Sequence, residues 1–136
     1  MQRIGKLLLI GLVTAIVLVG LGYAWGASGR RALQTAVDDT HQQLDVADAR
    51  GQLLDARVAL YNMNFGDASR RFEEAKVPLR RIRQRYVDGG QDDAARSLAA
   101  ALERVDEAQR LAGKLDQASN SKAGEALEAL KVATSK

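Results

Sequence analysis

One histidine stands among carboxylates, and this is the group of side chains in the sequence best suited to chemistry. His41 lies at helical spacing from Asp38, Asp45 and Asp48. Such a set could bind a divalent cation or titrate near neutral pH. A single imidazole beside flexible, exposed acids is a weak ligand set, however, and a solvated polar helix face explains the same spacing. We therefore predict no metal site and no bound cofactor.

The second charged group is a run of basic residues on the outward-facing positions of the helix predicted at 67–87. Lys76 belongs to this run. Six of these basic residues are candidate partner-binding residues: Arg70, Arg71, Arg80, Arg81, Arg83 and Arg85. They could meet an anionic partner, or they could form a solvated face with cations near a helix C-terminus. Beyond residue 32 the basic and acidic residues nearly balance, so we expect no nucleic-acid partner.

No residue pattern in the chain is typical of catalysis. The sequence has no cysteine, which removes thiolate nucleophiles, and the known phosphate-binding, zinc-protease and hydrolase motifs are absent. General acid–base catalysis needs a positioned histidine or a buried pair of carboxylates, whereas the acids here fall on outer helical faces. We predict that the protein is not an enzyme.

An uncharged apolar run occupies residues 7–27, and basic residues flank it on both sides. About 20 apolar residues in a helix cross the hydrocarbon core of a bilayer. Tyr23 and Trp25 near the end of the run are typical of the headgroup region. We predict a single-pass membrane protein, in a bacterial inner membrane, with its soluble domain outside the cytoplasm. A cleaved signal peptide is the alternative.

Small residues lie on one helical face of this run: Gly11, Ala15, Gly22 and Gly26. Small side chains at this spacing allow helices to approach closely in lipid. They are candidate residues for membrane helix packing. The expected partners are therefore the lipid bilayer and either other protein subunits or a second copy of the chain.

After the apolar run, apolar and small residues follow a spacing of four and three that is typical of a coiled coil. The positions are Leu33, Val37, Thr40, Leu44, Ala47, Gly51, Leu54, Val58, Tyr61 and Phe65. From residue 49 a second apolar row accompanies the first: Ala49, Leu53, Ala56, Leu60 and Met63. Two apolar faces require two helical neighbours. We predict a helical stalk at 30–48 and a bundle from residue 49 onward.

The predicted fold class is all-α: one N-terminal transmembrane helix (1–29), a stalk (30–48) and a small antiparallel helical bundle (49–136). The bundle helices are expected at about 49–63, 67–87, 91–117 and 122–133. Residues 62–67 are rich in Asn, Gly and Asp, and Gly89 and Gly90 follow Asp88, so both places predict turns. The four-and-three spacing continues through 62–67, which leaves a single long helix open there.

The segment 64–75 resembles the second half of a tetratricopeptide repeat. Ala68, Phe72 and Ala75 match the small, aromatic and small positions of that family, and Phe65 fits its turn aromatic. The resemblance covers about a third of the chain, with weaker echoes near Leu98 and Leu130 and without the family's constant repeat length. It implies helical hairpins with an interaction surface, and it transfers no binding residue.

These patterns favour a membrane-anchored helical protein–protein interaction or scaffold module, an accessory subunit of a membrane complex. The alternative is a single-pass sensory or ligand-binding helical bundle. An apolar stripe left exposed along the stalk would favour self-assembly or a partner helix. A buried apolar pocket with a polar lining would favour the sensor.

Overall fold

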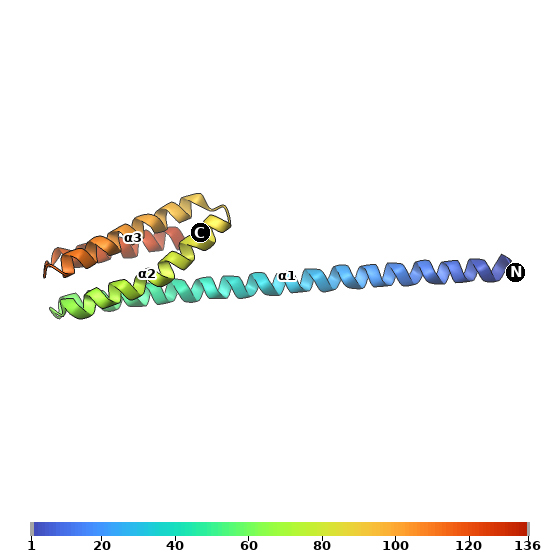
Figure 1. Cartoon of the computed structure of the whole chain (residues 1–136), viewed down its shortest axis with the longest axis horizontal. Coiled ribbons are helices and arrows are strands. Elements are labelled where there is room, and N and C mark those ends of the chain that lie inside the picture. The colour runs from blue at the N-terminus through green and yellow to red at the C-terminus, as the bar shows by residue number, and fades with distance from the viewer. Residues whose placement is uncertain (1, 136) are drawn as a thin grey trace. The chain divides into compact units, whose positions relative to one another are not determined.

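A computed structural model describes residues 2–135, and it describes the surroundings of the side chains at 14–19 and 33–135. These residues form four α-helices and no strand: α1 (Gln2–Tyr61), α2 (Phe65–Asp88), α3 (Asp92–Ala112) and α4 (Ala118–Thr134). Figure 1 shows the green end of α1 beside the green start of α2, with α3 following in orange. The predicted all-α class is confirmed.

The chain divides into two units, Met1–Thr40 and His41–Lys136. The described residues of the first unit belong to α1. There the hydroxyl of Thr40 donates to the carbonyl of Ala36 (2.8 Å), and Leu33 and Val37 are exposed. The boundary falls inside the segment 30–48 that the sequence predicts as a stalk.

The second unit is a bundle in which each helix runs antiparallel to the next, and α4 closes the bundle against α1. Each neighbouring pair is tied by a polar side-chain contact: Asp45 with Arg85, Lys76 with Asp106, Arg104 with Glu125, and Arg57 with Asn120. Along each neighbouring pair of helices, the residue number rises on one helix and falls on the other from one contact to the next. The two helices therefore pack antiparallel. The helical bundle predicted from the sequence is confirmed.

The core of the bundle is rich in alanine. More than half of its buried apolar residues are Ala, and Phe72, Leu53, Leu79, Ile82 and Leu98 are the largest fully buried side chains of the described residues. Alanine leaves little side chain between helices, so they can approach closely and still fill the space between them. The second row faces this core from Ala49 to Leu60, as the two-row pattern predicts. Its last predicted member, Met63, is 58% exposed because it lies in the turn after α1.

Three residues with positive φ end the first three helices and turn the chain. Met63 (φ 58°) follows α1, Gly90 (φ 68°) follows α2 and Leu115 (φ 58°) follows α3. Each turn is closed by a backbone hydrogen bond from the next residue, such as Asn64 N to Ala59 O (2.8 Å). This is the usual left-handed helix cap. The turn at Leu115 ends α3 at Ala112, earlier than the predicted 117, so Ser119 and Asn120 belong to α4.

The break between α1 and α2 lies at residues 62–64, and the single long helix is not observed. The side chain of Asn64 accepts a hydrogen bond from the backbone N–H of Asp67 (3.1 Å) and caps α2. Helix α2 then continues through Pro78 to Asp88. Pro78 is fully buried, so the ring that removes one backbone donor also fills the core.

The structure corrects the membrane prediction. Within the described part of the chain, no helix combines the length and the apolar character that a bilayer crossing requires. A crossing needs about 20 consecutive apolar residues, whereas the described side chains of α1 comprise only the short apolar stretch 14–19 and the charged, polar stretch from 33 onward. This finding contradicts the transmembrane helix, the single-pass topology and the inner-membrane location. Most of the run at 7–27 lies outside the residues whose side chains are described.

Candidate interaction surfaces

One face of α1 in the bundle unit is apolar and uncovered. We call it the α1 seam, and it consists of the heptad positions Leu44, Ala47, Gly51, Leu54, Val58 and Tyr61. The exposed fractions are 61% for Leu44, 60% for Val58 and 84% for Tyr61. The opposite face of the same helix is buried in the core. An exposed apolar row of this kind makes this face of α1 a candidate interaction surface.

The arginines predicted to bind a partner do not form one free basic surface. Arg81 and Arg85 both bind the carboxylate of Asp45, at 2.8 and 2.6 Å. Asp45 is only 8% exposed, although the sequence places it on a solvated face with His41. Because two arginines of α2 share this carboxylate, it fastens α1 to α2.

Two more of these arginines are engaged near the start of α2. Arg70 pairs with Asp67 and with Glu74 (3.1 Å), and the hydrogen bond to Asp67 raises the pKa of Arg70. Arg71 donates to Gln52 (3.1 Å) and lies 3.4 Å from Glu74. These cations are neutralised within the chain, which leaves less charge for an outside partner.

Arg80 and Arg83 remain exposed. Among the described residues, Arg83 makes no hydrogen bond or ion pair, and Arg80 acts only through its charge on Glu73. They are the members of the predicted set that could still attract an anionic partner. Two exposed cations supply little specific affinity on their own.

The other predicted candidates give no site in the described residues. Ala15 is exposed on α1, while Gly11, Gly22 and Gly26 lie outside the residues whose side chains are described. His41 is exposed, and no group of three acidic or histidine side chains in the described ranges could hold a metal ion. The packing role predicted for the small residues stays a prediction.

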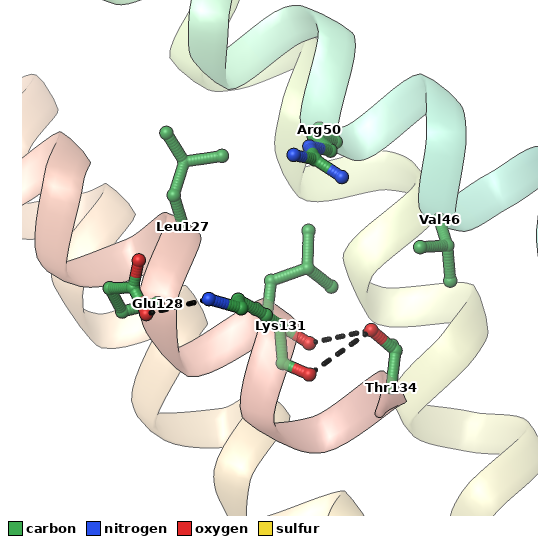
Figure 2. Close-up of a pocket in the computed structure, with 7 residues that line it drawn as sticks. Val46, Arg50, Leu127, Glu128, Lys131 and Thr134 are labelled. Atoms are coloured by element: carbon green, nitrogen blue, oxygen red, sulfur yellow. Dashed lines mark hydrogen bonds and ion pairs between the residues drawn. The ribbon is translucent and has the colours of Figure 1, made fainter. Parts of the chain in front are cut away.

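A pocket of about 230 Å³ opens between α1 and α4 (Figure 2). Its lining combines apolar and charged residues: Val46, Arg50, Leu127, Glu128, Leu130, Lys131 and Thr134. Figure 2 shows Glu128 joined to Lys131 (3.8 Å) and the Thr134 hydroxyl turned to backbone carbonyls, with Leu130 as nearest acceptor (2.9 Å). Ligand pockets are usually larger, about 300–1,000 Å³, and the polar groups here are largely satisfied by one another.

Lys76 is a buried cation that the sequence reading placed on the outer basic face. It is 6% exposed, and its ammonium group lies 2.6 Å from Asp106 and 3.0 Å from Glu73. Gln109 of α3 accepts a further hydrogen bond from it. The sequence could have predicted this burial, because Lys76 follows the core residue Phe72 by four positions and therefore lies on the same helix face. The pair with Asp106 ties α2 to α3.

Three pKa shifts follow from this packing. Burial lowers the pKa of Lys76, but the hydrogen bonds and charges of Asp106 and Glu73 outweigh it and raise that pKa above its ordinary 10.5. Burial raises the pKa of Tyr86 above its ordinary 10.0. The hydrogen bond that Glu73 accepts from Lys76 holds the pKa of Glu73 below its usual 4.5. The folded state therefore keeps the protons of Lys76 and Tyr86 to higher pH than the unfolded chain does.

We expect the bundle to lose stability as pH rises above about 10. Lys76 and Tyr86 bind their protons more tightly in the folded chain than in the unfolded chain. Each therefore adds fully to the free energy of unfolding at a pH below its unfolded-state pKa. This contribution is lost as the pH rises through the folded-state pKa. Urea unfolding of the full chain at a series of pH values from 8 upward would measure this, and Lys76→Met and Tyr86→Phe should each flatten the dependence. Lys114→Met, at an exposed lysine without an ion pair in the described structure, is the control. A Lys76→Met profile as steep as that of the parent chain would contradict the assignment.

No protein-family model, curated protein or solved structure matches this chain.

Proposed function

We propose that this protein is a helical protein–protein interaction module and that the α1 seam is its binding surface. The observation that carries the proposal is the exposure of an apolar row at heptad spacing on a helix whose opposite face is fully packed. Apolar side chains that face water are unfavourable in free energy. A partner helix with the same period removes this row from water.

The energetics of the seam suit a reversible interface. Full burial of a Val or Leu side chain contributes about 1.5–3 kcal/mol, and Leu44, Leu54 and Val58 are each at least 43% exposed. Tyr61 adds an aromatic ring, a residue type that often dominates interface energies. Ala47 and Gly51 contribute little area but let a partner backbone approach. The seam can therefore hold a partner without being needed for the fold of the bundle.

The sensory or ligand-binding alternative has less support. The pocket between α1 and α4 is small, and most of its charged and polar groups are paired within the chain. Two larger hollows, of about 480 Å³ at residues 90–96 and about 330 Å³ beside Gln42 and Tyr86, are open to solvent rather than buried. No cluster in the described ranges is arranged for metal binding. We therefore place the binding function on the α1 seam rather than in a pocket.

A thiol-accessibility experiment tests whether the seam is covered in the cell. The chain has no cysteine, so Leu54→Cys introduces a single thiol in the seam. A membrane-permeant maleimide would be applied to the full chain in its native cells and to the dilute purified chain. Since a bound partner removes the thiol from solvent, we expect labelling in cells to be slower by roughly tenfold.

Glu103→Cys is the matched control, because Glu103 is exposed on α3 and lies away from the seam. It should be labelled at similar rates in cells and in the dilute purified chain. If Leu54→Cys also reacted equally fast in both settings, the seam would be free in the cell, and the proposed function would be wrong.

A further inference from the structure

We propose that the partner of the α1 seam is a second copy of this chain, paired parallel and in register. The inference rests on the proposed function, since it requires that the seam be an interface. In heptad terms Leu44, Gly51 and Val58 occupy position a, and Ala47, Leu54 and Tyr61 occupy position d. A helix that packs along this row in a left-handed supercoil must carry the same 3.5-residue period. A second α1 meets that requirement.

The charges beside the seam select the orientation of the pair. Arg50 precedes a-position Gly51 and so occupies position g, while Asp55 follows d-position Leu54 and occupies position e. In a parallel, in-register pair, each g residue faces the e residue five positions later in the other chain. Arg50 of each copy therefore meets Asp55 of the other, and two-fold symmetry makes this contact twice.

The neighbouring positions agree with the parallel arrangement. Gln43 would face Asp48, so no like charges meet there. In an antiparallel pair, g faces g and e faces e. That arrangement would set arginines against arginines and aspartates against aspartates, which opposes pairing.

Both charged partners are available in the single chain. Arg50 is exposed and makes no ion pair among the described residues, and Figure 2 shows Glu128 joined to Lys131 rather than to Arg50. The side chain of Asp55 is 60% exposed and has only a long contact of 3.8 Å with Arg71. Arg71 is also held by Gln52 and Glu74, so it does not depend on Asp55.

Gly51 gives an independent indication of a close helical neighbour. Glycine is a poor helix former, and it persists in helix interiors where a backbone must approach closely. Within the chain, a β-carbon at Gly51 would meet no atom within 4 Å, so the packing of the bundle does not require a glycine there. A second α1 passing at Gly51 and Ala47 does require small residues.

Site-specific disulfide formation tests the pairing in the full chain. Leu44→Cys and Val58→Cys each place one thiol at position a, at opposite ends of the seam. In a parallel, in-register pair, identical positions face each other, so each variant should form a disulfide-linked dimer under mild oxidation. Glu103→Cys, on the outside of α3, should not. Crosslinking of Leu44→Cys only with Val58→Cys, in a mixture, would overturn the parallel orientation.

Charge exchange tests the register. Arg50→Asp and Asp55→Arg, each combined with Val58→Cys, replace attraction by repulsion at two symmetric contacts and should weaken dimerisation by about tenfold. Exchanging both residues restores opposite charges and should return the crosslinking to the parent level. Asp48→Arg makes the same charge change one heptad away but faces Gln43, so it should alter dimerisation much less. Equal effects of Asp48→Arg and Asp55→Arg would overturn the proposed register.

The two proposals fail in different ways. If Leu54→Cys is protected in cells but Val58→Cys forms no disulfide-linked dimer, self-pairing is wrong and another protein occupies the seam. If Leu54→Cys is unprotected as well, the interaction function itself fails. Equal dimer yields from Glu103→Cys and Val58→Cys would show association without use of the seam, which also overturns the inference.

Discussion

Replacement of Phe72 by alanine should lower the free energy of unfolding of the bundle by about 3–5 kcal/mol. Phe72 is the largest fully buried side chain among the described residues and lies in the first half of α2. Its loss removes apolar contacts and leaves a cavity that rigid neighbouring helices fill only in part. The free energy of unfolding of a small domain is about 5–15 kcal/mol in total. Phe72→Ala should therefore be partly unfolded at urea concentrations well below the unfolding midpoint of the parent chain.

The alanine-rich core makes this effect large. About half of the core residues are alanines, which have no long side chains that could rotate into the cavity. Urea unfolding of the full chain, followed by circular dichroism at 222 nm, would measure the change. Val77→Ala is the matched control, because Val77 lies on the same helix and is 52% exposed. It should change stability by less than about 0.5 kcal/mol. A Phe72→Ala effect as small as that of the control would place Phe72 outside the core.

Replacement of Asp45 by alanine should cost about 1–3 kcal/mol of stability. Its buried carboxylate accepts a charge-assisted hydrogen bond from Arg85 (2.6 Å) and forms an ion pair with Arg81 (2.8 Å). Without it, two arginines one turn apart on α2 lose their shared counter-charge and repel each other. The cost stays below that of breaking a fully buried ion pair, since the side chains of Arg81 and Arg85 are 54% and 34% exposed and can turn to water.

Asp48→Ala provides the comparison for Asp45→Ala. Asp48 lies one turn away on α1, is exposed and makes no ion pair in the described structure, so its removal should be nearly neutral. Raised salt should narrow the difference between the parent chain and Asp45→Ala only slightly, because a buried pair is screened less than a surface pair. If Asp45→Ala and Asp48→Ala unfolded at the same urea concentration, Asp45 would not fasten α1 to α2.

The local sequence determined the helices and most of their ends. Apolar rows with helical period give α1 to α4, and the buried row from Ala49 to Leu60 follows from the second face of the heptad pattern. Asn64 caps α2 and Gly90 turns the chain after it, since their side chains favour those conformations locally. The likeness of residues 64–75 to a tetratricopeptide repeat stays a prediction.

Positive-φ turns at ordinary residues could not be read from the sequence. Met63 and Leu115 have no local preference for that conformation, and they adopt it because the packed helices on both sides require the chain to reverse there. The end of α3 was therefore predicted several residues too late. The membrane prediction failed in another way: it rested on composition over residues 7–27, and no helix in the described ranges meets the requirement for crossing a bilayer.

Only the tertiary structure decided which charges remain available. The sequence shows six arginines on one helix, but it does not show that Asp45 and Gln52 of α1 lie within reach of three of them. It also does not show that Lys76 is buried against Asp106. Ion pairs between helices depend on crossing geometry and on contacts far apart in the chain, whereas helical period is local. For that reason the sequence alone determined the apolar faces, and the packing of the bundle decided that the α1 seam stays exposed while four of the six arginines of α2 are paired within the chain.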